Sequence, residues 1–189
     1  KTLADALPYK KLITAVGLNS SEVGNPPSKF QQVFAKAEAE GFLTVAHAGE
    51  EGPAEYVWEA LDLLNVSRVD HGNNSLDDEI LVQELVDRKM PLTVCPLSNL
   101  KLKVVTDLKG HPLREMLQKG LLATINSDDP AYFGGYMNAN YIEVVEALSL
   151  TKDEVCQLTK NAFKASFLNE SKKNDFIARV EDYCKENSF

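Results

Sequence analysis

The sequence contains little of what several common classes of protein require. Its 189 residues include three cysteines, three histidines and one tryptophan, and the formal net charge is −8. No run of basic residues is present, which argues against binding to a nucleic-acid backbone or to an anionic membrane surface. No apolar run reaches membrane-spanning length, and no signal peptide is recognised. We therefore expect neither a nucleic-acid partner nor a membrane partner.

The three cysteines, Cys95, Cys156 and Cys184, lie far apart and are odd in number. Their spacing matches neither a zinc finger nor a redox motif, which predicts a reducing intracellular compartment. We expect a cytoplasmic location, with the nucleus as a second one if the source is a eukaryote. We interpret Cys95 as a small buried apolar residue. The hydrophobic fraction of 44% is ordinary for a globular protein, so residues 1–189 are expected to form a single domain.

Short apolar segments alternate with helical patterns along most of the chain. We expect strands at 12–18, 42–46, 66–70, 92–95 and 121–126. We expect one helix capped by Ser28 and another capped by Ser75, with further helices at 112–119, 141–148, 152–167 and 175–185. Successive parallel strands require such crossover helices. The pattern predicts an α/β fold with a parallel sheet, either open or part of an eight-stranded barrel.

Polar and titratable residues follow four of these strands. The segments are V-A-H-A-G-E (45–50), R-V-D-H-G (68–72), T-V-C-P-L-S-N (93–99) and T-I-N-S-D-D-P (124–130). In a (β/α) barrel the carboxyl ends of the strands build the active site. Two histidines, one glutamate and a pair of aspartates at these ends predict a site that activates water with a metal ion.

Each candidate residue also has a structural interpretation. His47 is either a zinc ligand or an ordinary histidine at a strand end. Glu50 is either catalytic or an acid placed at a helix N-terminus. His71 is either a group that orients or deprotonates water or a histidine in a turn. Asp128 and Asp129 are either site residues or part of a turn or helix cap. The occurrence of all four segments in this order favours the functional interpretations.

The ordered set H-A-G-E, D-H-G, C-P-L-S-N and N-S-D-D-P resembles the adenosine/adenine deaminase family of the amidohydrolase superfamily. The resemblance extends from about residue 12 to the final helices. It implies a parallel (β/α)8 TIM-type barrel with one Zn²⁺ per complete active site and a small-molecule purine base as substrate. It also implies that His47 and Asp128 bind zinc, that Glu50 donates a proton to purine N1, that His71 orients or deprotonates the zinc-bound water, and that Asp129 contacts N7.

The segment G-L-N-S-S-E-V-G-N-P-P (17–27) resembles the corresponding loop of the adenine deaminases, with Asn19 in place of the usual Asp. This resemblance implies hydrolysis of adenine to hypoxanthine and ammonia in purine salvage. The alternatives are adenosine or AMP deaminase-type activity, or an inactive fragment or paralogue that serves as a folding or interaction module. AMP is the weaker alternative, because no basic cluster for a phosphate is visible.

The sequence departs from the family in its histidines. The family's H-x-H pair on the first barrel strand is absent, and the only histidines are His47, His71 and His111. A catalytic zinc normally has at least three protein ligands. We therefore expect the chain to supply about the last five strands and the C-terminal helices of a barrel, with an N-terminal barrel segment as its missing partner. We interpret His111, which precedes Pro112, as structural.

Overall fold

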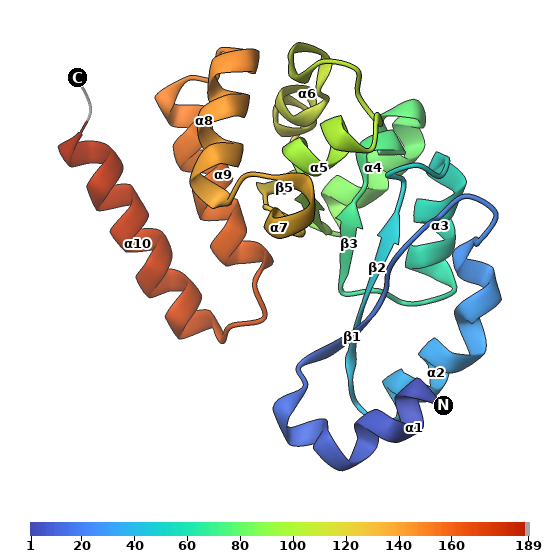
Figure 1. Ribbon diagram of the computed structural model, residues 1–189. Coiled ribbons are helices and arrows are strands. Elements are labelled where there is room, and N and C mark those ends of the chain that lie inside the picture. Colours follow the sequence, from blue (N-terminus) through green and yellow to red (C-terminus); the bar gives the residue numbers. More distant parts are fainter. Residues whose placement is uncertain (188–189) are drawn as a thin grey trace. The chain divides into compact units, whose positions relative to one another are not determined.

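The computed structural model of the protein (Figure 1) describes residues 1–187. The chain divides into two compact units, one from residue 1 to 84 and one from residue 85 onward. The first unit contains the strands β1 (Ala15–Leu18), β2 (Leu43–Ala48) and β3 (Arg68–His71). The second contains β4 (Pro91–Val94) and β5 (Leu122–Ile125). All five predicted strands are confirmed. Their bounds differ from the predicted ones by one to three residues, except for the end of β1 at Leu18, which is as predicted.

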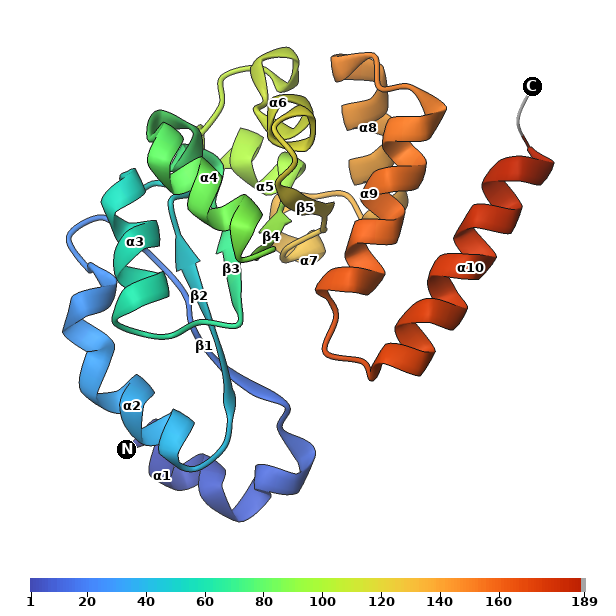
Figure 2. The same cartoon turned by 180° about the vertical axis from the view of Figure 1, so that it is seen from behind.

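The strands of the first unit are parallel, and two helices cover one face of their sheet. β1 pairs with β2 from Ala15 opposite Leu43, and β2 pairs with β3 from Val45 opposite Arg68. The helices α2 (Gln31–Ala39) and α3 (Ala54–Asp62) lie on the same face in Figures 1 and 2. Buried side chains fill this interface: Phe34, Ala37, Val57, Ala60 and Leu61. The apolar spacing in these helices therefore reports the face that packs on the sheet.

Two predicted helix caps are wrong. Ser28 lies inside a short 3-10 helix (η2, Pro27–Phe30) that precedes α2, and its backbone N–H donates to Glu59. Ser75 lies in a second 3-10 helix (η3, Asn73–Asp77). The next helix, α4 (Glu79–Asp87), starts after Asp78, whose Oδ1 accepts from the N–H groups of Ile80 and Leu81 at 2.9 and 3.2 Å. A cap must stand directly before the first turn, and only Asp78 does so.

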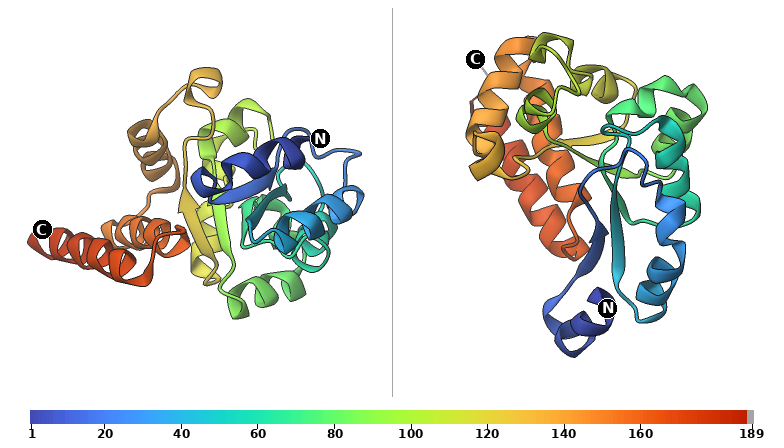
Figure 3. Two further views of the ribbon diagram at one scale, coloured as in Figure 1. Left: turned by 90° about the horizontal axis from the view of Figure 1, so that it is seen from below. Right: turned by 45° about the vertical axis from the view of Figure 1, so that its right-hand side comes forward.

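A helical segment that the sequence did not indicate precedes β1. It consists of α1 (Thr2–Ala6) and η1 (Leu7–Leu12), neither of which has a buried residue. Without a buried face, these residues carry no periodic apolar signal. The segment lies at the amino ends of β1 and β2 (Figure 3, right), where Lys10 bonds to the Glu40 carbonyl and lies 5.7 Å from the ring centroid of Phe42.

In the second unit, β4 and β5 are parallel, with Pro91 opposite Leu122. The long helix α9 (Lys152–Ala165) packs on β5, where its buried Asn161 donates to the Ala123 carbonyl at 2.9 Å. The remaining helices are α5 (Pro96–Lys101), η4 (Leu108–Gly110), α6 (Leu113–Gln118), α7 (Pro130–Phe133), α8 (Met137–Leu148) and α10 (Glu170–Glu186). The short helices α5 and α7 were not predicted, because six and four residues are too few to show a helical period.

Helix α10 has no buried residue among those described and is held beside α9 (Figures 2 and 3). A disulfide joins Cys156 of α9 to Cys184 of α10, and the rings of Phe163 and Phe176 stack with centroids 4.8 Å apart. The spacing of the cysteines did not indicate this bond, because the two antiparallel helices bring together residues 28 positions apart. Disulfides are uncommon in reducing compartments, so the cytoplasmic location stays a prediction. None of the helices within residues 1–187 is long and apolar enough to cross a membrane.

His111 is buried and held in one tautomer, in agreement with the structural interpretation. Its Nδ1 accepts from the backbone N–H of Leu113 at 3.1 Å, so Nε2 carries the proton and donates to Asn99 Oδ1 at 3.2 Å. Burial lowers the pKa of His111 from 6.5 to about 4. The folded protein therefore keeps this ring neutral at pH values where the unfolded chain protonates it.

This pKa shift predicts a loss of stability in mild acid. The contribution of neutral His111 to the free energy of unfolding is fully present above pH 6.5. It is lost as the pH falls toward 4, because the unfolded chain binds the proton first. At 1.36 kcal/mol per pKa unit the contribution is about 3 kcal/mol. We expect His111→Gln to reduce the fall in unfolding free energy between pH 7 and 4.5 by about 2 kcal/mol. Urea denaturation at several pH values measures this, and equal falls in parent and variant would contradict it.

Candidate active site

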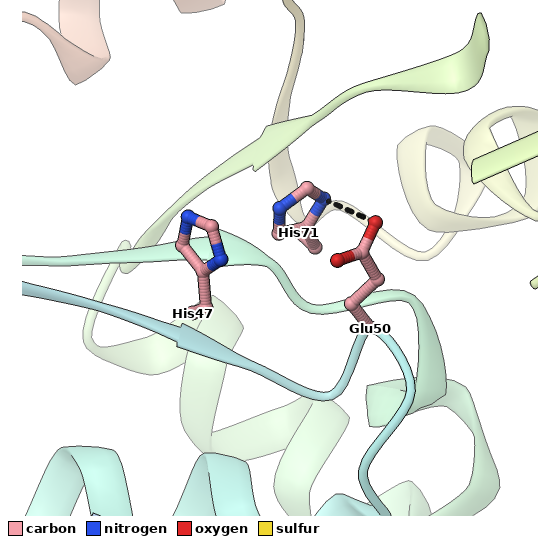
Figure 4. Close-up of side chains that lie close together, drawn as sticks. All are labelled: His47, Glu50 and His71. Carbon is pink, nitrogen blue, oxygen red and sulfur yellow. Dashed lines mark ion pairs between the residues drawn. The ribbon is translucent and has the colours of Figure 1, made fainter. Parts of the chain in front are cut away.

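Two histidines and a glutamate meet at the carboxyl ends of β2 and β3. His47 is the second-last residue of β2 and His71 is the last residue of β3, which the strand register places opposite Ala48. Glu50 follows β2 in a turn that begins at Gly49, whose φ of 72° lies in the left-handed region. Figure 4 shows the side chains of His47, Glu50 and His71 directed toward one another. The first unit alone therefore assembles three of the five predicted site residues.

The three side chains form a compact polar cluster. His71 Nδ1 lies 3.2 Å from Glu50 Oε1, and the two residues are 1% and 6% exposed. The ring of His47 meets that of His71 edge to face, with centroids 4.7 Å apart. If His71 is neutral, Nδ1–H donates to the Glu50 carboxylate and Nε2 is the proton-accepting nitrogen. The cluster can therefore take up a proton at His71 Nε2, and Glu50 can deliver one when its carboxyl is protonated.

The donor atoms of this cluster also fit a metal ion. One ligand atom from each of His47, Glu50 and His71 lies within 4.8 Å of the other two. Imidazole nitrogen and carboxylate oxygen are the donors that zinc takes in catalytic sites. The donor set therefore has the chemistry to hold a divalent metal ion such as zinc.

The turn that carries Glu50 is fixed on both sides by side chains that the sequence analysis did not single out. The carboxylate of Glu22 accepts from the N–H of Glu50 at 3.0 and 3.2 Å and from the N–H of Gly52 at 2.8 Å. The side-chain amide of Asn74 donates to the carbonyls of Glu50 and Gly52 at 3.2 and 2.8 Å. The turn therefore has four backbone groups bound to two side chains.

Glu22 is only 4% exposed, and this burial raises the pKa of its carboxyl above the usual value. The N–H groups of Glu50 and Gly52 and the charge of His47 oppose part of that rise in pKa. Glycine is required at position 52, because a Cβ there would lie 2.5 Å from Cδ2 of Tyr56 and 2.7 Å from Oε2 of Glu22. In the sequence, the role of Glu22 was indicated only by its place as an acidic residue among the turn-forming residues of the 17–27 segment.

A small cavity opens beside His47. Its volume is about 220 Å³, and the loop after β1 supplies most of its lining, including Asn19, Ser20, Ser21 and Glu22. This is the loop that resembles the adenine deaminases. The candidate zinc ligand and the candidate specificity loop therefore line the same cavity.

Asp128 and Asp129 belong to the second unit and follow β5. Asp128 has a left-handed backbone, with φ of 55°, and its Oδ1 accepts from the N–H of Asp129 at 2.8 Å. Asp129 is the N-cap of α7, where its Oδ1 accepts from the N–H of Tyr132 at 3.3 Å. The capping interpretation of Asp129 is confirmed, and the roles of both aspartates toward zinc and purine stay predictions. In the C-P-L-S-N segment Cys95 is buried, as expected.

Comparison with known proteins supplies the wider context. The adenosine deaminase family model matches residues 1–183. An adenine deaminase from Acinetobacter baylyi is 61% identical over 180 residues, which cover 95% of this chain and 54% of that protein. The crystal structure of adenine deaminase from Arthrobacter aurescens matches with a TM-score of 0.94 and 46% identity, over 97% of this chain and 56% of that one.

A crystal structure of an amidohydrolase from Burkholderia ambifaria with bound zinc matches with a TM-score of 0.86 and 26% identity, over 97% of this chain and 53% of that one. The chain thus spans about half the length of the curated relatives it matches. Its strands and helices form part of the amidohydrolase barrel fold, which confirms the predicted fold class. The chain belongs to the adenosine deaminase family.

Proposed function

We propose that the complete protein containing this chain hydrolyses adenine to hypoxanthine and ammonia and so serves purine salvage. The observation that carries the proposal is the contact between Glu50 and His71 beside His47, because a carboxyl and two imidazoles are the groups that the proposed proton transfers and metal binding would use. The names of the relatives from Acinetobacter and Arthrobacter support adenine as the substrate.

Zinc is the proposed cofactor. His47 and Asp128 would hold it, and the zinc in the Burkholderia relative supports this choice of metal. When bound, zinc supplies a water molecule whose pKa is lowered to about 7. The remaining chemistry falls to side chains of this chain.

Two of those side chains move protons, and a third contacts the substrate. His71 accepts a proton from the attacking water, whose oxygen forms a new bond to the amino-bearing ring carbon of adenine. Glu50 donates a proton to N1, which makes that carbon more electrophilic. Asp129 holds N7. His71 returns its proton to the amino nitrogen, the bond from the ring carbon to that nitrogen breaks, and ammonia leaves. The new hydroxyl becomes the carbonyl of hypoxanthine, and its proton restores the Glu50 carboxyl.

The cavity and its loop support a free base as the substrate. A cavity of about 220 Å³ is smaller than the range of about 300–1,000 Å³ that drug-sized ligands occupy. The loop that lines it resembles that of the adenine deaminases. A free base is the smallest of the candidate substrates and needs no contacts to ribose or phosphate.

Substrate choice tests the proposal. We expect kcat/KM for adenine to exceed that for adenosine and AMP by at least about 100-fold, because a pocket shaped for the base excludes ribose. Ammonia release by the zinc-loaded complete protein measures all three. Comparable rates with adenosine would make adenosine the substrate. A folded, zinc-loaded protein that releases ammonia from none of them would favour the non-catalytic module.

A further inference from the structure

The turn at residues 49–52, of which only Glu51 is exposed, is bound through its backbone by two side chains. Its N–H groups at Glu50 and Gly52 point to one carboxylate, that of Glu22, and its carbonyls at the same two residues point to one amide, that of Asn74. The backbone N–H of Asn74 also donates to the Gly49 carbonyl at 2.8 Å. The backbone that carries the Glu50 side chain is therefore bound from two separate segments of the chain.

Burial of a carboxylate such as that of Glu22 costs free energy, and hydrogen bonds to its charged form must offset that cost. The Glu22 carboxylate accepts hydrogen bonds from two N–H groups of this one turn, those of Glu50 and Gly52. A buried carboxylate bound in this way fixes the position of the backbone. A catalytic side chain depends on such fixing, because its reacting atoms must be placed to within a fraction of an ångström.

We propose that Glu22 and Asn74 are positioning residues that hold the Glu50 carboxylate against His71, an inference that rests on the proposed function. Glu22 comes from the loop that lines the cavity beside His47, so the same residue joins the wall of the substrate cavity to the backbone of the proton donor. Asn74 follows β3 three residues after His71 and joins that turn to the strand end that carries the acceptor.

The test is a double-mutant cycle in the complete, zinc-loaded protein. Glu22→Gln replaces one of the two accepting oxygens with an NH₂ group that cannot accept from the backbone N–H groups, and Asn74→Asp places a carboxylate against two carbonyls. Each is expected to lower kcat for adenine by about 10- to 100-fold, with KM changed less than about threefold. In a Glu50→Gln background the same changes should cost less than about twofold more, because residues that act through Glu50 have nothing left to position.

Glu51→Gln is the matched control, since Glu51 is exposed in the same turn and the charge change is identical. It should leave kcat unchanged, and zinc content and circular dichroism should match the parent in every variant. Losses that add fully in the Glu50→Gln background would overturn the proposal, because a general loss of structure acts independently of Glu50.

A second readout does not depend on activity. Hydrogen exchange at the amides of Glu50 and Gly52 should accelerate by at least about tenfold in Glu22→Gln and remain at the parent rate in Glu51→Gln. If the parent releases no ammonia from adenine but these amides respond as expected, the proposed function fails and the bound turn stands. If exchange at both amides is unchanged, the positioning role fails whatever the activity.

Discussion

Glu50→Gln is expected to lower kcat for adenine by about 10²–10⁴-fold while zinc content stays at the parent level. The glutamine keeps the size of the side chain and an oxygen that can accept from His71 Nδ1–H, 3.2 Å away in the parent. It has no carboxyl proton to give to N1. Because Glu50 is 6% exposed, solvent does not readily replace it as the donor.

Steady-state ammonia release and metal analysis of the same samples measure this effect. Glu51→Gln, in the same turn but exposed, serves as the control and should behave as the parent. Turnover within a few-fold of the parent would remove Glu50 from the proton-donor role. Loss of zinc from Glu50→Gln would instead make Glu50 a ligand, for which the 4.8 Å cluster with His47 and His71 also has the donor atoms.

The two adjacent aspartates are expected to differ sharply when each is changed to alanine. Asp128→Ala removes a proposed ligand and should lower zinc affinity by at least about tenfold, with activity lost in parallel. Asp129→Ala should keep zinc and raise KM for adenine, and it should also cost about 1 kcal/mol through the lost cap of α7.

Zinc content, zinc titration and adenine kinetics on both variants decide this prediction. Asp129→Asn is a useful companion, because asparagine is as good an N-cap as aspartate and separates the capping effect from the loss of charge. Equal loss of zinc from Asp128→Ala and Asp129→Ala would show that the two residues do not have separate roles.

Most of the fold could be predicted because the five strands are apolar runs that end abruptly in polar residues. The helix starts were harder, since Ser28, Ser75 and Asp78 are all good capping residues and only the backbone path selects among them. The α1 and η1 segment left no trace in the pattern, because none of its residues is buried. The pairing of Cys156 with Cys184 likewise depends on how two helices lie side by side.

The residues of the candidate site also include some that could be predicted from the sequence and some that could not. His47, Glu50 and His71 could be selected because their residue types carry chemistry and they stand at strand ends. Glu22 and Asn74 could not, because a glutamate and an asparagine in loops are ordinary. Their partners in the turn lie 28 and 24 residues away for the bonds to Glu50, and only the tertiary structure brings them together.

His71 has a left-handed backbone, with φ of 68°, and Gly72 follows with φ of 74°. A residue with a Cβ pays for this conformation, whereas glycine adopts it without cost and asparagine at reduced cost. Only histidine offers an imidazole there. The backbone conformation and the buried contacts therefore favour different amino acids at one position: glycine would relax the backbone, but it would leave a cavity beside Glu50 and remove the imidazole that contacts its carboxyl.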